Sequence, residues 1–205
     1  MNLEYFYAKM GSYIYEVGYM SYFPAFITLE GKKVLLVGGG NIATQKLQKL
    51  LDFTHNIEII APFICENILK LAQEYSLTYE NRAYKNGDIK ECSLVVIAVD
   101  DLNLQKEIYE ESQEYKCLCN AVDSVKYCDF IFPSYVKEGD LTIAISTSGA
   151  SPAFAKHFKT YLKEKLPKNI GNFLQEMKAL RLSIPKGKKR MKMLDEKAKN
   201  FIEKL

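Results

Sequence analysis

Short apolar runs alternate with segments of helical periodicity through much of the chain. Apolar residues three or four positions apart predict helices over residues 41–51, 64–75 and 102–115. Continuous apolar runs are typical of strands that a sheet buries on both faces. Such alternation predicts an α/β fold, a doubly wound parallel sheet with helices on both faces. The expected strands are Val34–Val37, Ile57–Ile60, Leu77–Tyr79, Leu94–Val99 and Cys117–Val122.

The pattern changes after the fifth expected strand, where two apolar segments flank a glycine-containing turn. These segments, Asp129–Val136 and Leu141–Ser146, predict a β-hairpin. Ser151 and Pro152 are typical of a helix N-terminus, and further amphipathic segments follow them. The chain therefore continues beyond its α/β part with a hairpin and a helical tail. The expected helices cover residues 152–166, 170–182 and 191–205.

A glycine-rich turn connects the first expected strand to the first expected helix. Gly38, Gly40 and Ala43 have the spacing Gly-x-Gly-x-x-Ala, which in a strand–turn–helix context is typical of dinucleotide-binding, Rossmann-like folds. Gly38 allows the tight turn, Gly40 lets the backbone approach a pyrophosphate, and Ala43 lets the helix pack on the strand. The helix N-terminus offers N–H groups and a positive dipole end to the phosphates. A strand–turn–helix that binds no ligand is the alternative.

Ligands of such sheets lie beyond the carboxyl ends of the strands. Residues 38–42, 61–63, 99–101 and 120–123 are therefore expected to border one crevice. Asp100 and Asp101 follow a strand directly, a position that suits turn-capping or nucleotide contact better than catalysis. The second strand is followed by Ala61-Pro62, so the acidic residue that usually binds the adenosine ribose is missing there. One element of discrimination against NADP is therefore absent.

Composition narrows the class of protein. The chain has 205 residues, 48% of them hydrophobic, and a net charge of only +3, which suits a globular protein with a real core better than a nucleic-acid-binding one. No segment reaches the length of a transmembrane helix, so no membrane partner is expected, and Met1–Tyr22 lacks the apolar core of a signal peptide. The five cysteines lack framework spacing, which predicts core thiols and a cytoplasmic location. The basic run Lys186–Arg190 predicts a solvated helix start.

Several motifs occur together in the order and spacing of one known family: Phe23-Pro24, Val37–Ala43, Asn120–Asp123, Phe130–Ser134 and Ser146–Ala153. Over residues 22–182 the chain resembles the precorrin-2 dehydrogenases, the dehydrogenase and ferrochelatase module of siroheme synthases. The resemblance implies that precorrin-2 is oxidised to sirohydrochlorin with NAD as hydride acceptor, and it leaves ferrous iron insertion open as a second activity. It also implies an intertwined homodimer. The implied domains are an N-terminal extension (1–21), an NAD-binding Rossmann domain (22–124), a dimerisation hairpin (125–150) and a helical C-terminal domain (151–205).

Site residues follow from the same resemblance, position by position. The catalytic aspartate falls on Asp123, and Thr147 stands where the family has serine, which keeps the hydroxyl and adds a methyl group. The stretch that contains Thr147 is expected to bind the carboxylates of the substrate, or alternatively only to cap a helix. The expected cofactor-binding residues are Gly38, Gly40, Asn41, Ile42, Pro62, Phe63, Val99 and Asp100. The expected substrate-binding residues are Thr147, Ser148, Gly149 and Ser151.

The chemistry of the implied reaction also favours Asp123. Aromatising a tetrapyrrole needs a hydride acceptor and a nearby group that removes a proton, and a carboxylate partly desolvated by a large ring is suited to that role. The alternative is that Asp123 only caps the turn before Ser124. His55 and His157 are the only histidines, so we expect no metal site built from imidazoles. Two other functions stay open: an NAD-binding regulatory module without catalysis, and a chelatase that has lost its dehydrogenase activity.

Overall fold

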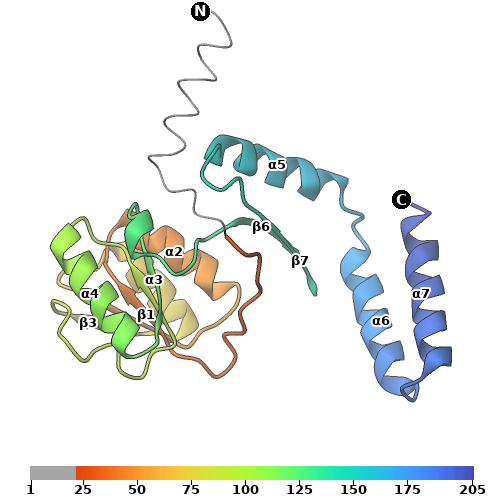
Figure 1. The fold of residues 1–205 in the computed structure, drawn as a ribbon, viewed down its shortest axis with the longest axis horizontal. Helices are drawn as coiled ribbons and strands as arrows, with labels where there is room; N and C mark the ends of the chain where they lie inside the picture. Colours follow the sequence, from red (N-terminus) through yellow and green to blue (C-terminus); the bar gives the residue numbers. More distant parts are fainter. Residues whose placement is uncertain (1–21) are drawn as a thin grey trace, which may run out of the picture. The chain divides into compact units, whose positions relative to one another are not determined.

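The computed structural model of the chain describes residues 22–205. Residues 23–131 and 132–205 form two compact units, which Figure 1 shows coloured along the sequence. The predictions for residues 1–21, an N-terminal extension that lacks a signal peptide, lie outside the described residues.

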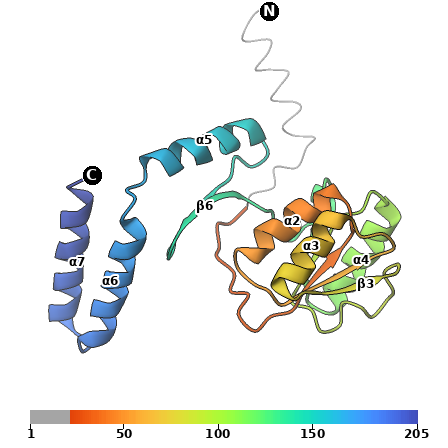
Figure 2. The same cartoon turned by 180° about the vertical axis from the view of Figure 1, so that it is seen from behind.

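The first unit is an α/β layer structure. Its elements are β1 (Val34–Val37), α2 (Asn41–Leu51), β2 (Ile57–Ala61), α3 (Glu66–Tyr75), β3 (Thr78–Asn81), β4 (Leu94–Ile97), α4 (Leu102–Glu114) and β5 (Leu118–Ala121). The strands form a parallel sheet with the order β3-β2-β1-β4-β5. Helices α2 and α3 lie on one face of the sheet and α4 on the other, and Figure 2 shows the face of α2 and α3. The predicted Rossmann-like, doubly wound sheet is therefore confirmed.

The central strands can be recognised in the sequence because they are buried. Every residue of β1 and β4 is at most 4% exposed, so both strands are covered by helices on each face. Strand β3 is exposed along its whole length because it lies at the edge of the sheet, and it covers Thr78–Asn81 instead of the predicted 77–79. Strand β4 ends at Ile97, two residues before the predicted Val99, because the chain turns there into the loop before α4.

The carboxyl ends of the central strands lie side by side. Val37 pairs in register with Ile60 of β2 and with Ile97 of β4, which in turn pairs with the last residue of β5. The hydrogen bonding continues one step further: Ala98 N–H donates to Val37 O at 2.7 Å, and Val122 N–H donates to Ile97 O at 2.9 Å. The loops after β1, β4 and β5 therefore leave the sheet at the same edge.

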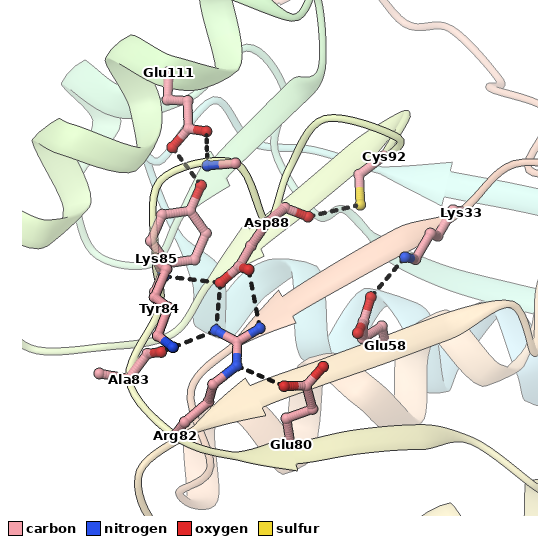
Figure 3. A network of polar contacts seen from close by, with 11 residues as sticks. Lys33, Glu58, Glu80, Arg82, Ala83, Tyr84, Lys85, Asp88, Cys92 and Glu111 are labelled. Carbon is pink, nitrogen blue, oxygen red and sulfur yellow. Dashed lines mark hydrogen bonds and ion pairs between the residues drawn. The ribbon is translucent and has the colours of Figure 1, made fainter.

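A polar network holds the long connection between β3 and β4 against α4 (Figure 3). The Arg82 guanidinium donates two hydrogen bonds to the Asp88 carboxylate, at 2.7 and 2.9 Å. Glu111 of α4, which is only 5% exposed, accepts hydrogen bonds from the Tyr84 hydroxyl and from Gly87 N–H, both at 2.6 Å. Burial and the contact with Glu111 raise the pKa of Tyr84, so its hydroxyl remains a proton donor in this contact. Side-chain hydrogen bonds thus order a segment that has no regular secondary structure.

The second unit is an antiparallel hairpin followed by helices. Its elements are β6 (Ser134–Glu138), β7 (Leu141–Ile145), α5 (Pro152–Lys165), α6 (Ile170–Ser183) and α7 (Lys188–Ile202). Helix α5 packs on β6, and α6 contacts both β7 and α7. The hairpin and the helical tail are therefore confirmed, as is the helix start in the basic run, since α7 begins at Lys188. None of the helices in residues 22–205 combines the length and the apolar character needed to cross a bilayer.

The start of the hairpin was predicted too early. Strand β6 begins at Ser134 and not at Asp129, and residues 125–131 belong to the first unit. The Asp129 carboxylate accepts a hydrogen bond from Cys119 N–H of β5 at 2.8 Å, and the Asn120 side-chain amide donates to Phe130 O at 2.8 Å. These contacts attach the segment to β5, and they are made through a side chain and a loop carbonyl that sequence periodicity does not report.

Candidate functional site

The glycine turn after β1 packs tightly between two neighbouring loops. Gly38 has a φ of +130°, and a Cβ atom there would lie 2.3 Å from Ala98 O. A Cβ atom on Gly39 would lie 1.8 Å from Phe63 O, on the other side of the turn. Gly38 therefore has the predicted role in the tight turn. A side chain at position 39 is excluded for a different reason, because it would collide with the backbone that follows β2.

Gly40 differs from its two neighbours because a Cβ atom there would meet no atom of the described residues within 4 Å, its own chain neighbours apart. Gly40 is the N-cap of α2, no side chain caps this helix, and its first turn contains no acidic residue. Helix α4 differs, because the Asp101 carboxylate accepts hydrogen bonds from Asn103 N–H and Leu104 N–H at 2.9 and 3.2 Å. The N-terminus of α2 thus combines open space above Gly40 with N–H groups and a positive dipole end, which fits a pyrophosphate.

A cavity of about 270 Å³ lies at the strand ends beside this helix N-terminus. It brings together six of the predicted site residues, from three separate segments of the chain: Gly40, Asn41, Ile42, Val99, Asp100 and Asp123. Val122 also lines it, as expected for residues 120–123, and three further lining residues were not predicted: Ala98, Leu102 and Gln105. Gly38, Pro62 and Phe63 do not line the cavity. Phe63 lies against the glycine turn through its backbone, and its side chain is 74% exposed.

Asp123 occupies an unusual backbone conformation at the end of β5. Its φ is +61°, in the left-handed region that is rare for residues other than glycine, asparagine and aspartate. The side chain is exposed, and within residues 22–205 its carboxylate accepts no hydrogen bond, so it does not cap the turn before Ser124. Backbone conformations of this kind cost about 1 kcal/mol or more and are concentrated at functional sites. Asp101, in contrast, does have the turn-capping role considered for it.

Lys46 on α2 is a partly buried lysine. Burial and the neighbouring Lys49 lower the pKa of Lys46, while Cys128 and Asp123 oppose that shift. The effect of Asp123 is the smallest of the four.

The five cysteines are free thiols, and three of them are core residues as predicted: Cys92, Cys117 and Cys119. Cys65 and Cys128 are partly exposed, and Cys128 packs against the core. Cys65 is the N-cap of α3, and its N–H donates to Gly39 O in the glycine turn at 2.9 Å. Burial tends to raise the pKa of the Cys65 thiol, but its contact with Thr44 Oγ1 at 3.3 Å and nearby backbone N–H groups outweigh this effect and lower the pKa.

We expect iodoacetamide to alkylate Cys65 before the core thiols. Burial raises the pKa of Cys92 to about 11 and the pKa values of Cys117 and Cys119 to about 12, so these thiols are both shielded and protonated near neutral pH. Timed labelling at pH 8 followed by peptide mass spectrometry measures the order, and NAD should slow labelling of Cys65 beside the glycine turn. Labelling of a core thiol first would contradict the expectation.

The stretch Thr147–Ser151 in the second unit is a closed turn. Ser151 N–H donates to Thr147 Oγ1 at 3.1 Å, and Phe154 N–H donates to Ser151 Oγ at 3.1 Å, so Ser151 caps α5 as predicted. Ser148 and Gly149 are exposed, with φ values of +50° and +85°. Within the stretch, Ser148 N–H also donates to Ser146 Oγ and Ala150 N–H to Thr147 O, so three of its N–H groups are already used. Anion binding by the stretch stays a prediction.

Two other features of the described chain were considered as sites. A groove of about 450 Å³ lies between α6 and α7, next to Phe173 and Phe201, whose rings stack with centroids 3.9 Å apart. It contains none of the predicted site residues. His157 is exposed on α5, and no group of three or more histidine, cysteine or acidic side chains within residues 22–205 is arranged to hold a metal ion.

Three residues near the cavity were missed by sequence reasoning. Gly39 was passed over because it falls between the two glycines of the motif, and Lys46 because helical periodicity does not show what a partly buried lysine faces. Gln105 gave a usable signal, since it precedes Ile108 by three positions and therefore lies on the inward face of α4. A polar residue on a buried helix face needs hydrogen-bond partners, which is a reason to examine it.

Comparisons with known proteins agree with this geometry. The model of the family described as "Putative NAD(P)-binding" matches residues 25–134, and the model described as "Sirohaem biosynthesis protein central" matches residues 138–164. A solved structure entitled "SirC, precorrin-2 dehydrogenase" has a TM-score of 0.71 and 24% sequence identity, and the match covers 85% of this chain and 88% of that one. This structural likeness confirms the fold of the chain.

The chain also resembles curated relatives in its amino-acid sequence. The siroheme synthase of Ruthia magnifica subsp. Calyptogena magnifica is 36% identical over 156 residues, and that of Pseudoalteromonas translucida (strain TAC 125) is 34% identical over 152 residues. The alignments cover 76% and 74% of this chain but only 33% and 32% of the relatives, so the match spans about a third of their length. The resemblance first seen in the motifs is confirmed. Because the first family model covers more than half of its 205 residues, the chain belongs to the NAD(P)-binding family which that model describes.

Proposed function

We propose that the chain is a precorrin-2 dehydrogenase, an NAD-dependent oxidoreductase that converts precorrin-2 to sirohydrochlorin in siroheme biosynthesis. The observation that carries the proposal is the cavity at the strand ends, which is lined both by the uncapped N-terminus of α2 and by Asp123. The siroheme synthases among the relatives and the precorrin-2 dehydrogenase among the solved structures support a tetrapyrrole as the substrate.

The proposed reaction removes a hydride and a proton from precorrin-2. When bound, the nicotinamide ring would supply the hydride acceptor. Gly40 and the first turn of α2 hold the pyrophosphate, and Asn41 and Val99 line the space beside it. Asp123 accepts the proton through its exposed carboxylate and releases it to solvent, so charge and atoms balance.

We propose NAD in preference to NADP because the arginine nearest the end of β2 is already paired. Asn81 of β3 is in register with Ala61 of β2, and Arg82 follows directly. The Arg82 guanidinium forms ion pairs with both Glu80 and Asp88, and both partners raise its pKa. An NADP 2′-phosphate needs a free cation at this position, and Arg82 would have to give up two carboxylates to supply it.

The second unit is proposed to bind the tetrapyrrole, through Thr147, Ser148, Gly149 and Ser151, and a second copy of the chain. Helices α6 and α7 contain no buried residue, and an aromatic row on α5 is largely uncovered. Its members Phe154, Phe158 and Tyr161 are 57%, 36% and 52% exposed, and neighbouring rings stack. Uncovered apolar surface of this kind is typical of an interface and supports a homodimer. A cytoplasmic location is proposed because all five cysteines are free thiols.

The decisive experiment is to mix the purified chain with precorrin-2 and NAD. We expect NADH absorbance and the sirohydrochlorin spectrum to appear together, with at least about tenfold lower activity when NADP replaces NAD, equivalent to about 1.4 kcal/mol. A control without protein measures spontaneous oxidation of the substrate. Light scattering on the same preparation reports whether the active species is a dimer.

Each alternative has its own outcome in this experiment. An NAD-binding regulatory module would bind NAD and give neither product. A chelatase without dehydrogenase activity would be inactive with precorrin-2 and NAD, yet would insert ferrous or cobaltous ion into supplied sirohydrochlorin faster than the control without protein. Activity in both assays would assign both reactions to the chain.

A further inference from the structure

We propose that Gln105 is a positioning residue of the proposed dehydrogenase: its side-chain amide joins the ends of β4 and β5 and fixes the turn that carries Asp123. The proposal rests on the proposed function and adds to it a residue that neither the motifs nor the family resemblance single out. Gln105 lies in the first turn of α4, lines the cavity and is only 3% exposed.

The contacts of Gln105 cross between two strand ends. Its Nε2 donates to Val99 O at 2.7 Å and to Val122 O at 3.4 Å. Val99 follows β4 and Val122 follows β5, so one side chain holds the two loops that deliver Asp100 and Asp123 to the cavity. Both partners are carbonyl oxygens, which only accept, and this fixes the orientation of the amide with its NH₂ group toward the loops.

The oxygen of the same side chain makes no hydrogen bond. Gln105 Oε1 is buried and has no partner within residues 22–205. A buried acceptor without a partner is destabilising, which makes glutamine an unfavourable choice if the position served packing alone. Methionine has a similar shape and has no such cost. The glutamine is therefore explained by what its NH₂ group does at the two strand ends.

The contacts of Gln105 constrain the turn at Asp123. Val122 is held from both sides, because its N–H donates to Ile97 O at 2.9 Å while its carbonyl accepts from Gln105. The peptide that connects Val122 to Asp123 is thus fixed in orientation immediately before the residue with φ of +61°. A left-handed backbone persists only where its surroundings over-determine it. The hydrogen bond from Gln105 is one such constraint.

The test compares Gln105→Met with the unchanged chain and with Gln73→Met, the same substitution at an exposed position of α3, which lies on the other face of the sheet. Hydrogen–deuterium exchange is followed in the peptide that contains residues 122–127. We expect exchange there to be at least about tenfold faster in Gln105→Met only, because the turn loses a constraint.

We expect kcat for precorrin-2 to fall about 10- to 100-fold in Gln105→Met, while KM and the Kd for NAD change by less than about threefold. The melting temperature should change by a few degrees at most, since the variant also removes the unpartnered oxygen.

A second variant, Gln105→Glu, should show a pH dependence of kcat that a role in packing alone would not produce. An ionised carboxylate repels the two carbonyl oxygens, whereas the protonated form donates to one of them, so relative kcat should recover as the pH is lowered. Unchanged exchange, unchanged kcat, or a kcat loss that follows the folded fraction would each overturn the positioning role. If the unchanged chain itself does not oxidise precorrin-2, the proposed function fails, and the exchange comparison still decides whether Gln105 fixes the turn.

Discussion

Asp123→Asn is expected to lower the turnover of precorrin-2 by about 100- to 10,000-fold, the range that a positioned general base contributes. The substitution removes the negative charge and keeps the shape of the side chain. Asparagine also tolerates the left-handed conformation that Asp123 adopts, so the turn is preserved. The Kd for NAD should stay within about threefold, because Asp123 is proposed to act on the tetrapyrrole and not on the nucleotide. Stopped-flow absorbance of NADH and a separate binding titration measure the two quantities.

Two control variants separate the charge of Asp123 from its backbone conformation. Asp100→Asn makes the same chemical change in the same cavity, and it should affect NAD affinity more than turnover. Asp123→Gly satisfies the positive φ without a carboxylate, so it should be as inactive as Asp123→Asn. Full activity of Asp123→Gly would mean that the residue serves only the turn, and the proposed catalytic role would then be withdrawn.

Neighbouring glycines of the turn after β1 are expected to respond to alanine in opposite ways. Gly40→Ala should fold normally, because the new Cβ atom meets no protein atom within 4 Å and the φ of −95° suits any residue. It should raise the Kd for NAD by at least about tenfold, or about 1.4 kcal/mol, because the methyl group enters the space proposed for the pyrophosphate. Calorimetry of NAD binding, with a melting curve of the same sample, measures both effects.

Gly39→Ala should instead unfold or severely destabilise the first unit. Its Cβ atom would lie 1.8 Å from Phe63 O, and a backbone atom cannot move aside as a flexible side chain can. Overpacking of this kind costs about 1–3 kcal/mol or more. Gly187→Ala is the matched control, since Gly187 is also a helix N-cap in open space and has extended backbone with φ of +170°. It should change neither stability nor NAD affinity appreciably. Wild-type NAD affinity in Gly40→Ala would refute the proposed pyrophosphate site.

Much of the first unit was predictable because its central strands are buried on both faces. Burial selects a continuous apolar run, as in β1 and β4, and such a run is visible without any knowledge of the fold. The exposed edge strand β3 has no such signal, and its predicted bounds differ from the observed ones at both ends. The start of β6 was missed because residues 129–131 are attached to β5 and do not join the hairpin, through contacts of the Asp129 carboxylate and of Phe130 O that periodicity does not show.

The candidate site was likewise predicted only in part. The rule that ligands lie beyond the carboxyl ends of parallel strands predicted that Gly40, Val99, Asp100 and Asp123 would meet, and they line one cavity. Pro62 and Phe63 were expected at the same crevice and lie outside its lining. Gln105 was not predicted as a site residue, because its role depends on two carbonyl oxygens that lie 6 and 17 positions away in the sequence.

The sequence by itself determined the α/β class, the glycine turn at the exit of the first strand, the hairpin and the helical tail. It could do so because periodicity, glycine spacing and helix caps are local properties that neighbouring residues encode. Only the tertiary structure decided which glycine faces open space and which faces Phe63, that the Asp123 carboxylate accepts no hydrogen bond from the described residues 22–205, and that Gln105 joins two strand ends. These facts depend on distances between segments far apart in the chain, and such distances exist only once the sheet has formed.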